Sequence, residues 1–104
     1  MIIFYHKTTG KIEGTIAGRV HDKQHLNMWI GDKTETDRIV IQWKPIRWLN
    51  KDRQDVAEGS DEVMYTIYDI DHQQKDLIAD MEKNFSAVPS RYRVNVETKQ
   101  IIPV

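Results

Sequence analysis

The chain has 104 residues and a formal net charge of −1, with 39% hydrophobic and 30% charged residues and no cysteine. This length fits a single domain over residues 1–104 with one modest core. The composition excludes disulfides, thiolate metal sites, cysteine nucleophiles and a global field that would attract nucleic acid or anionic membrane. The apolar run at residues 1–5 is too short for a signal peptide or a membrane span, so we expect a cytoplasmic protein without membrane contact.

The first elements predicted are two strands joined by a turn. Residues 2–6 form an apolar run, residues 7–11 carry the turn chemistry Lys-Thr-Thr-Gly-Lys, and apolar and polar residues alternate over 11–18. This pattern predicts an N-terminal β-hairpin. Residues 23–29 could form a short helix capped by Asp22, although an extended or turn structure is the open alternative.

The middle of the chain predicts two further strands. Residues 38–44 alternate clearly, and Pro45 marks an edge, a bulge or the end of that strand. Residues 46–49 could continue it after a kink, and 50–61 is expected to be a flexible loop. Residues 62–70 are apolar on both faces, which favours a central strand.

One good helix follows. Leu77, Ile78, Met81 and Phe85 have helical spacing, so we expect a helix over 72–84 with Asp71 as its cap and Gln74 completing a capping box. Residues 92–96 and 100–104 predict a C-terminal hairpin. The predicted fold is therefore α+β: a mainly antiparallel sheet of about five to six strands, with N- and C-terminal hairpins, packed by one amphipathic helix.

The segment Trp43-Lys44-Pro45-Ile46-Arg47-Trp48 places two tryptophans and two cations within six residues. Tryptophan is enriched where proteins bind partners, but a small chain also needs its aromatic residues to fill the core. One hypothesis is single-stranded nucleic-acid binding, in which the rings stack on bases and the cations contact phosphate. The residues assigned to it are Trp43, Lys44, Arg47 and Trp48.

A second hypothesis is protein binding, which needs no special motif. Residues 52–82 hold ten carboxylates against two cationic side chains, so this segment is either a solvated surface or a surface that docks on a basic partner. Sheet edges marked by proline could also pair by strand addition or form a homodimer. The residues assigned to partner binding are Trp29, Trp43, Trp48, Asp55, Glu58, Asp61 and Glu62.

A third hypothesis is a metal-dependent hydrolase. His21 and His25 are four residues apart, as paired ligands on one helical face require, and two carboxylates lie at the end of a predicted strand. The metal set is His21, His25, Asp69 and Asp71, although Asp71 already has a structural task as the predicted cap. The chain has no nucleophile elbow and no glycine-rich phosphate loop, so a non-catalytic protein that needs no cofactor is preferred over an enzyme.

Three segments give the chain an overall similarity to short phage and prophage proteins of uncharacterised type. They are residues 2–12 (IIFYHKTTGKI), 25–32 (HLNMWIGD) and 92–99 (YRVNVETK). The resemblance transfers no site residues. It implies a virion accessory protein or an inhibitor of host defence that acts in the host cytoplasm through an acidic and aromatic surface.

Overall fold

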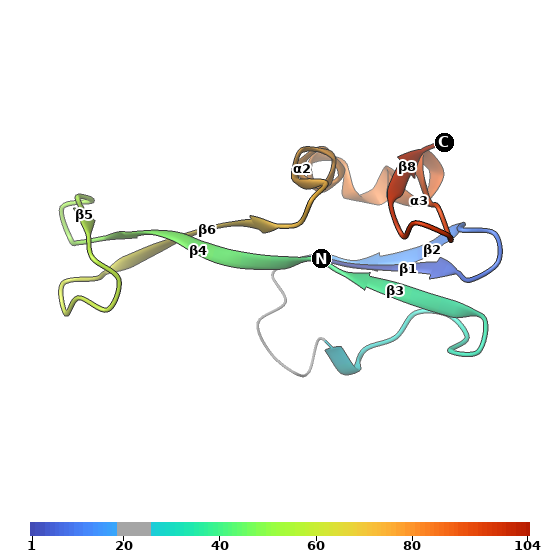
Figure 1. Cartoon of the computed structure of the whole chain (residues 1–104), viewed down its shortest axis with the longest axis horizontal. Coiled ribbons are helices and arrows are strands. Elements are labelled where there is room, and N and C mark those ends of the chain that lie inside the picture. The colour runs from blue at the N-terminus through green and yellow to red at the C-terminus, as the bar shows by residue number, and fades with distance from the viewer. Residues whose placement is uncertain (19–25) are drawn as a thin grey trace.

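The computed structural model describes residues 1–18 and 26–104. The molecule is elongated. Its radius of gyration is 16.3 Å and its principal extents are 49 × 26 × 24 Å, whereas a compact chain of this size has a radius of gyration of about 13 Å. Figure 1 shows the reason: β4 and β6 leave the other elements together and extend as a two-stranded ribbon, with β5 at its far end.

The α+β class is confirmed, but the single large sheet is wrong. The described strands form three small antiparallel sheets, ordered β2-β1-β3, β5-β4-β6 and β7-β8. The elements are β1 (Ile2–His6), β2 (Ile12–Ile16), β3 (Thr36–Val40), β4 (Gln42–Leu49), β5 (Asp55–Val56), β6 (Tyr65–Asp71), α2 (Lys75–Lys83), the 3-10 turn η1 (Phe85–Ala87), α3 (Val88–Arg91), β7 (Tyr92–Val94) and β8 (Ile101–Pro103).

The sheet divides because the strand predicted over 38–44 is split at Ile41. This residue is fully buried, and its N–H donates to the Met1 carbonyl at 2.8 Å, so β3 ends against β1 and β4 begins in a different sheet. Pro45 does not end β4. The strand continues to Leu49 with a register shift between Pro45 and Arg47, which identifies Ile46 as a bulged residue.

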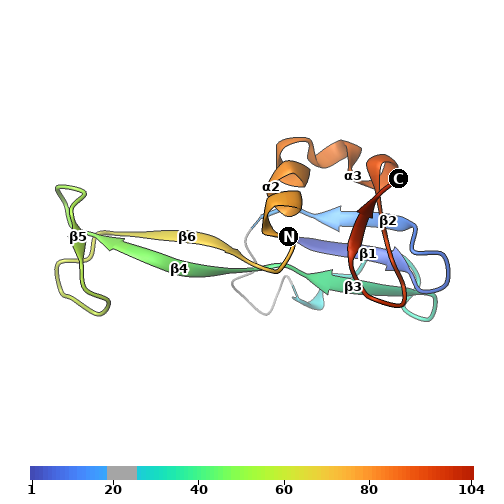
Figure 2. The same cartoon turned by 45° about the horizontal axis from the view of Figure 1, so that its top comes forward.

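The first sheet contains the core of the molecule. Met1 to Tyr5 are all buried, which makes β1 a central strand covered on both faces. One face joins the core cluster with residues of α2, α3, β7 and β8, and Figure 2 shows these elements over β1 and β2. On the other face, the rings of Phe4 and Trp29 meet edge to face with their centroids 5.3 Å apart.

The predicted helix is present, but its expected start is wrong. Ile78 and Met81 are buried, and Leu77 and Phe85 pack against the core, as the spacing predicts. However, α2 begins at Lys75 after Gln74, and neither residue of the predicted capping box makes a side-chain cap bond. Asp71 is instead the last residue of β6, and its carboxylate pairs with Lys44 at 3.8 Å.

The C-terminal strand pair packs on the N-terminal one through backbone contacts. Val94 N–H donates to the Gly10 carbonyl at 2.8 Å, and Lys11 and Arg93 form an isolated antiparallel bridge. The antiparallel pairs expected at both chain ends therefore occur, but they lie in separate sheets. Within residues 1–18 and 26–104, no helix is long and apolar enough to cross a membrane.

Asp22 and residues 23–25 of the short helix predicted over 23–29 lie outside the described residues. Of the rest, Leu26 and Asn27 are helical, whereas Met28 and Trp29 are not. Residues 50–61, expected to be a flexible loop, contain β5 and a turn organised by Asn50, whose side-chain carbonyl accepts from the backbone N–H groups of Asp52 and Gln54 at 2.9 Å each.

Candidate functional site

The projecting ribbon is the candidate functional element, and we call residues 44–69 the arm. At its base Trp43 lies opposite Ile70, and both residues pack with the core. Beyond this pair no described helix or sheet covers the ribbon, as both views show. An isolated two-stranded ribbon is marginally stable in water, so its side chains and its base must hold it together.

Several large apolar side chains of the arm are exposed. The exposed fractions are 43% for Ile46, 66% for Met64, 41% for Tyr65 and 36% for Ile67. Elsewhere in the described chain, only Met28 and Val104 are large hydrophobic residues with comparable exposure. Exposed apolar surface gathered on one element, rather than scattered singly, is typical of an interaction site.

The register assigns residues of the outer arm to two faces, because directly opposite residues in an antiparallel pair share a face. Trp48 lies opposite Thr66 on one side and Val56 on the other, so these three share the first face. Leu49 lies between Tyr65 and Asp55, and Arg47 lies opposite Ile67, so the second face combines apolar and charged groups. Neither face is purely polar.

The second face is fixed by two cationic side chains. Arg47 Nε and Nη2 donate to the two carboxylate oxygens of Asp55 at 3.0 and 3.1 Å, and the guanidinium of Arg53 lies 4.7 Å from the centroid of the Tyr65 ring. The hydrogen bonds from Arg47 lower the pKa of Asp55, and those to Asp55 raise the pKa of Arg47. Arg47 and Arg53 are thus engaged within the arm.

The far end of the arm is acidic. Residues 51–62 hold five carboxylates and two cationic side chains. Among the residues that the structure describes, Glu58, Asp61 and Glu62 have no cationic side chain within ion-pair distance. Asp61 and Glu62 line a hollow of about 300 Å³ together with Met64. We call residues 50–63 the tip of the arm.

The structure separates the residues predicted to bind a partner. Trp48, Asp55, Glu58, Asp61 and Glu62 all lie on the arm. Trp43 lies at its base against the core, and Trp29 lies on the opposite part of the molecule. The ring of Trp29 is half-buried: its Nε1 donates to Thr36 Oγ1 at 2.9 Å, and the cations of Lys33 and Arg38 lie 5.6 and 5.0 Å from it.

The residues assigned to nucleic-acid binding are adjacent, but their cations have carboxylate partners. Lys44 pairs with Asp71 at 3.8 Å, and Arg47 pairs with Asp55. The arm as a whole holds four cationic and six acidic side chains. Single-strand binding relies on a positively charged groove, which this arrangement does not provide.

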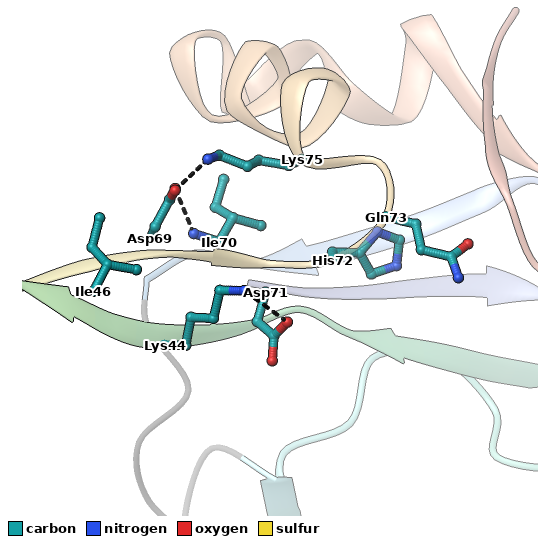
Figure 3. Close-up of a pocket in the computed structure, with 8 residues that line it drawn as sticks. All are labelled: Lys44, Ile46, Asp69, Ile70, Asp71, His72, Gln73 and Lys75. Carbon is teal, nitrogen blue, oxygen red and sulfur yellow. Dashed lines mark hydrogen bonds and ion pairs between the residues drawn. The ribbon is translucent and has the colours of Figure 1, made fainter.

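The structure describes two of the four residues assigned to a metal site, Asp69 and Asp71. His21 and His25 lie outside the described residues. Figure 3 shows Asp69 turned toward Lys75 of α2, whereas Asp71 is turned away and lies beside Lys44. All four residues line a hollow of about 810 Å³ at the base of the arm. Each carboxylate is engaged by a lysine, and the part of the chain described here contains no group of three potential ligands.

The exposed apolar residues Ile46, Met64, Tyr65 and Ile67 were not predicted as functional. The signal was present in the strand predicted over 62–70, which is apolar on both faces. That pattern indicated a central strand, and this is wrong, because β6 lies at the edge of its sheet and β4 is its one partner among the described strands. A two-sided apolar strand at an edge indicates a surface that another molecule could cover.

Comparison of the chain with protein-family models, with curated proteins and with solved structures finds no match.

Proposed function

We propose that this protein is a non-catalytic protein-binding module and that the arm is its binding element. The observation that carries the proposal is the placement of Ile46, Met64, Tyr65 and Ile67, all exposed, on a ribbon that no described helix or sheet covers. Full burial of an aliphatic or aromatic side chain contributes about 1.5–3 kcal/mol. Covering these partly exposed groups would therefore stabilise a complex and the arm itself.

The charge at the tip suggests the kind of partner. Glu58, Asp61 and Glu62 would meet a complementary basic surface, which steers association more than it adds affinity. In the phage-type context that the sequence suggests, the partner would be a host protein with a basic, nucleic-acid-binding surface. The paired cations of the arm support this proposal over direct binding of nucleic acid.

The test compares matched substitutions on the arm and elsewhere. Met64→Lys places a charge on the arm, and Met28→Lys is the control at a similarly exposed methionine (66% and 50% exposed). The triple reversal of Glu58, Asp61 and Glu62 to lysine removes the tip charge, and reversal of the exposed Glu13, Glu35 and Glu97 is its control. Circular dichroism first establishes that each variant is folded.

The tagged proteins are then used to capture partners from bacterial lysate, with and without nuclease. We expect a protein that survives nuclease, is retained by the two control variants, and is lost with Met64→Lys and with the tip reversal. Capture that is equally strong with all variants would overturn the assignment to the arm. Recovery of nuclease-sensitive nucleic acid, weakening steeply with salt, would favour the nucleic-acid alternative.

A further inference from the structure

The two edges of the arm differ in how well they are protected from pairing with another strand. On the β4 edge, β5 pairs with Trp48 and Leu49, and the preceding stretch contains Pro45 and the bulge at Ile46. Proline and bulges are the devices by which proteins prevent an edge from pairing with another strand. The β6 edge contains neither of them along Tyr65–Asp71, and no described strand pairs with it.

The exposed edge of β6 also has the composition of a strand that pairs. Tyr65-Thr66-Ile67-Tyr68 consists of aromatic and β-branched residues, which have the highest strand propensities. The charged residues of the strand, Asp69 and Asp71, lie at its end nearest the core. The outer half of the edge is thus uncharged, whereas charged residues on an edge would discourage pairing.

We infer that β6 pairs antiparallel with β6 of a second copy of this chain, so that two arms form one continuous sheet. The charge pattern of the strand is compatible with this self-pairing. In a register with Ile67 on the two-fold axis, Asp69 of each copy faces Tyr65 of the other, and Thr66 faces Tyr68, so no like charges stand opposite one another. A register centred on Asp69 would place two carboxylates in direct opposition, which is destabilising.

This pairing would stop at two copies. The combined sheet has β4 of each copy near its outside, and both outer edges then carry Pro45, the Ile46 bulge and β5. A symmetric contact between the two β6 edges leaves only protected edges on the combined arms, so it closes on itself, whereas a sheet with unprotected outer edges could grow into fibres. The two faces of the arm and its acidic tip are not consumed by edge pairing.

The first experiment measures molar mass by sedimentation over a wide concentration range. We expect a concentration-dependent dimer for the wild-type protein and a monomer for Ile67→Lys, which would place two ammonium groups opposite each other at the axis. Ile46→Lys is the matched control, since Ile46 is exposed to a similar degree on the protected edge (43% against 36%), and it should remain dimeric.

A second experiment uses the absence of cysteine from the chain. Directly opposite residues have Cβ atoms about 4.5–5.5 Å apart, so a single cysteine in Ile67→Cys should give a disulfide-linked dimer under mild oxidation. Ile46→Cys should not. Because cross-linking captures the folded pair directly, this result does not depend on how well Ile67→Lys folds.

The inference rests on the proposed function, but the two can fail separately. A wild-type protein that is monomeric at every concentration, or an Ile67→Lys variant that stays dimeric, would overturn the pairing of β6. Equal cross-linking at Ile67 and Ile46 would overturn it as well. If the arm still captures a protein from lysate in an arm-dependent manner, the proposed function stands with a different occupant of the edge.

Discussion

Arg47 and Asp55 form a two-pronged ion pair across the outer arm, with both nitrogen–oxygen distances between 3.0 and 3.1 Å. The sequence placed Arg47 in a nucleic-acid site and Asp55 in an acidic protein-binding surface. In the fold each residue neutralises the other, so neither is available as a bare charge. The pair joins β4 to β5, so we expect it to stabilise the outer arm.

Substitution of Asp55 by asparagine should loosen the outer arm. The change removes the carboxylate that holds Arg47, so the backbone amides of Trp48 and Val56 should exchange with solvent faster. Amide hydrogen exchange measures this, and exchange at β1 should not change. Asp80→Asn, which removes an exposed pair with Lys83 on α2, is the control and should leave the arm unaffected. High salt should weaken the effect, because the Arg47–Asp55 pair is exposed.

Substitution of Gly10 by alanine should be far more costly than the same change at Gly59. Both glycines have a positive φ, 77° and 80°, so the two variants share a backbone strain of about 1–2 kcal/mol. At Gly10 the new Cβ would also lie 1.9 Å from the Val94 carbonyl oxygen, whereas nothing lies within 4 Å at Gly59. Urea denaturation of both variants checks this, and equal losses would argue against the close packing of the two terminal strand pairs.

Substitution of Gln74 by alanine should destabilise the protein by about 1–3 kcal/mol, since it leaves backbone groups without partners. The Gln74 amide accepts from Ile101 N–H at 2.8 Å and donates to the Ile101 carbonyl at 2.6 Å, so it ties the start of α2 to β8. Gln73→Ala is the control at the exposed neighbouring position. Thermal and urea unfolding should separate the two variants clearly.

Acid should destabilise the junction between the arm and α2. A hydrogen bond from Lys75, aided by the Ile70 N–H, lowers the pKa of Asp69. A carboxylate whose pKa is lower in the folded state stabilises that state above its unfolded pKa of about 3.9, and this contribution disappears as pH falls further. Asp69→Asn should therefore flatten the loss of stability below about pH 5, measured as the unfolding temperature at each pH.

The flattening should be partial. Asp37, held by the Arg38 N–H, and Asp55, held by Arg47, also have lowered pKa values and would still contribute in the variant. An Asp69→Asn profile that is as steep as that of the wild type would contradict the role given to the Lys75 contact.

The sequence predicts the local helix and strand segments of this chain better than it predicts which strands pair. The stripe of Leu77, Ile78, Met81 and Phe85 identifies α2 because helical spacing depends only on near neighbours. The start of α2 was wrong because Asp71 remains in β6, and the residue that precedes the helix uses its side chain on a distant strand. Such long-range competition for a side chain leaves no local pattern.

The arm could not be predicted because strand periodicity does not say which strands pair. A strand with apolar residues on both faces fits a central position in a large sheet as well as a position in an exposed ribbon. The decisive residue is Ile41, whose burial against Met1 directs β4 away from the first sheet. Trp48 and the tip acids lie together on the arm, and their distance from Trp29 depends on that one change of direction.

The opposition of Trp43 and Ile70 at the base brings the two ends of the arm close together in space. A single short turn could therefore join them, and the chain would still pass from the first sheet to α2. Lys44 and Asp69, next to that pair, still contact Asp71 and Lys75, but no described residue further out forms an ion pair with α2. Changes in the length or composition of residues 45–68 would thus be tolerated by the rest of the fold, and selection for a new partner could act on this ribbon with little consequence for folding.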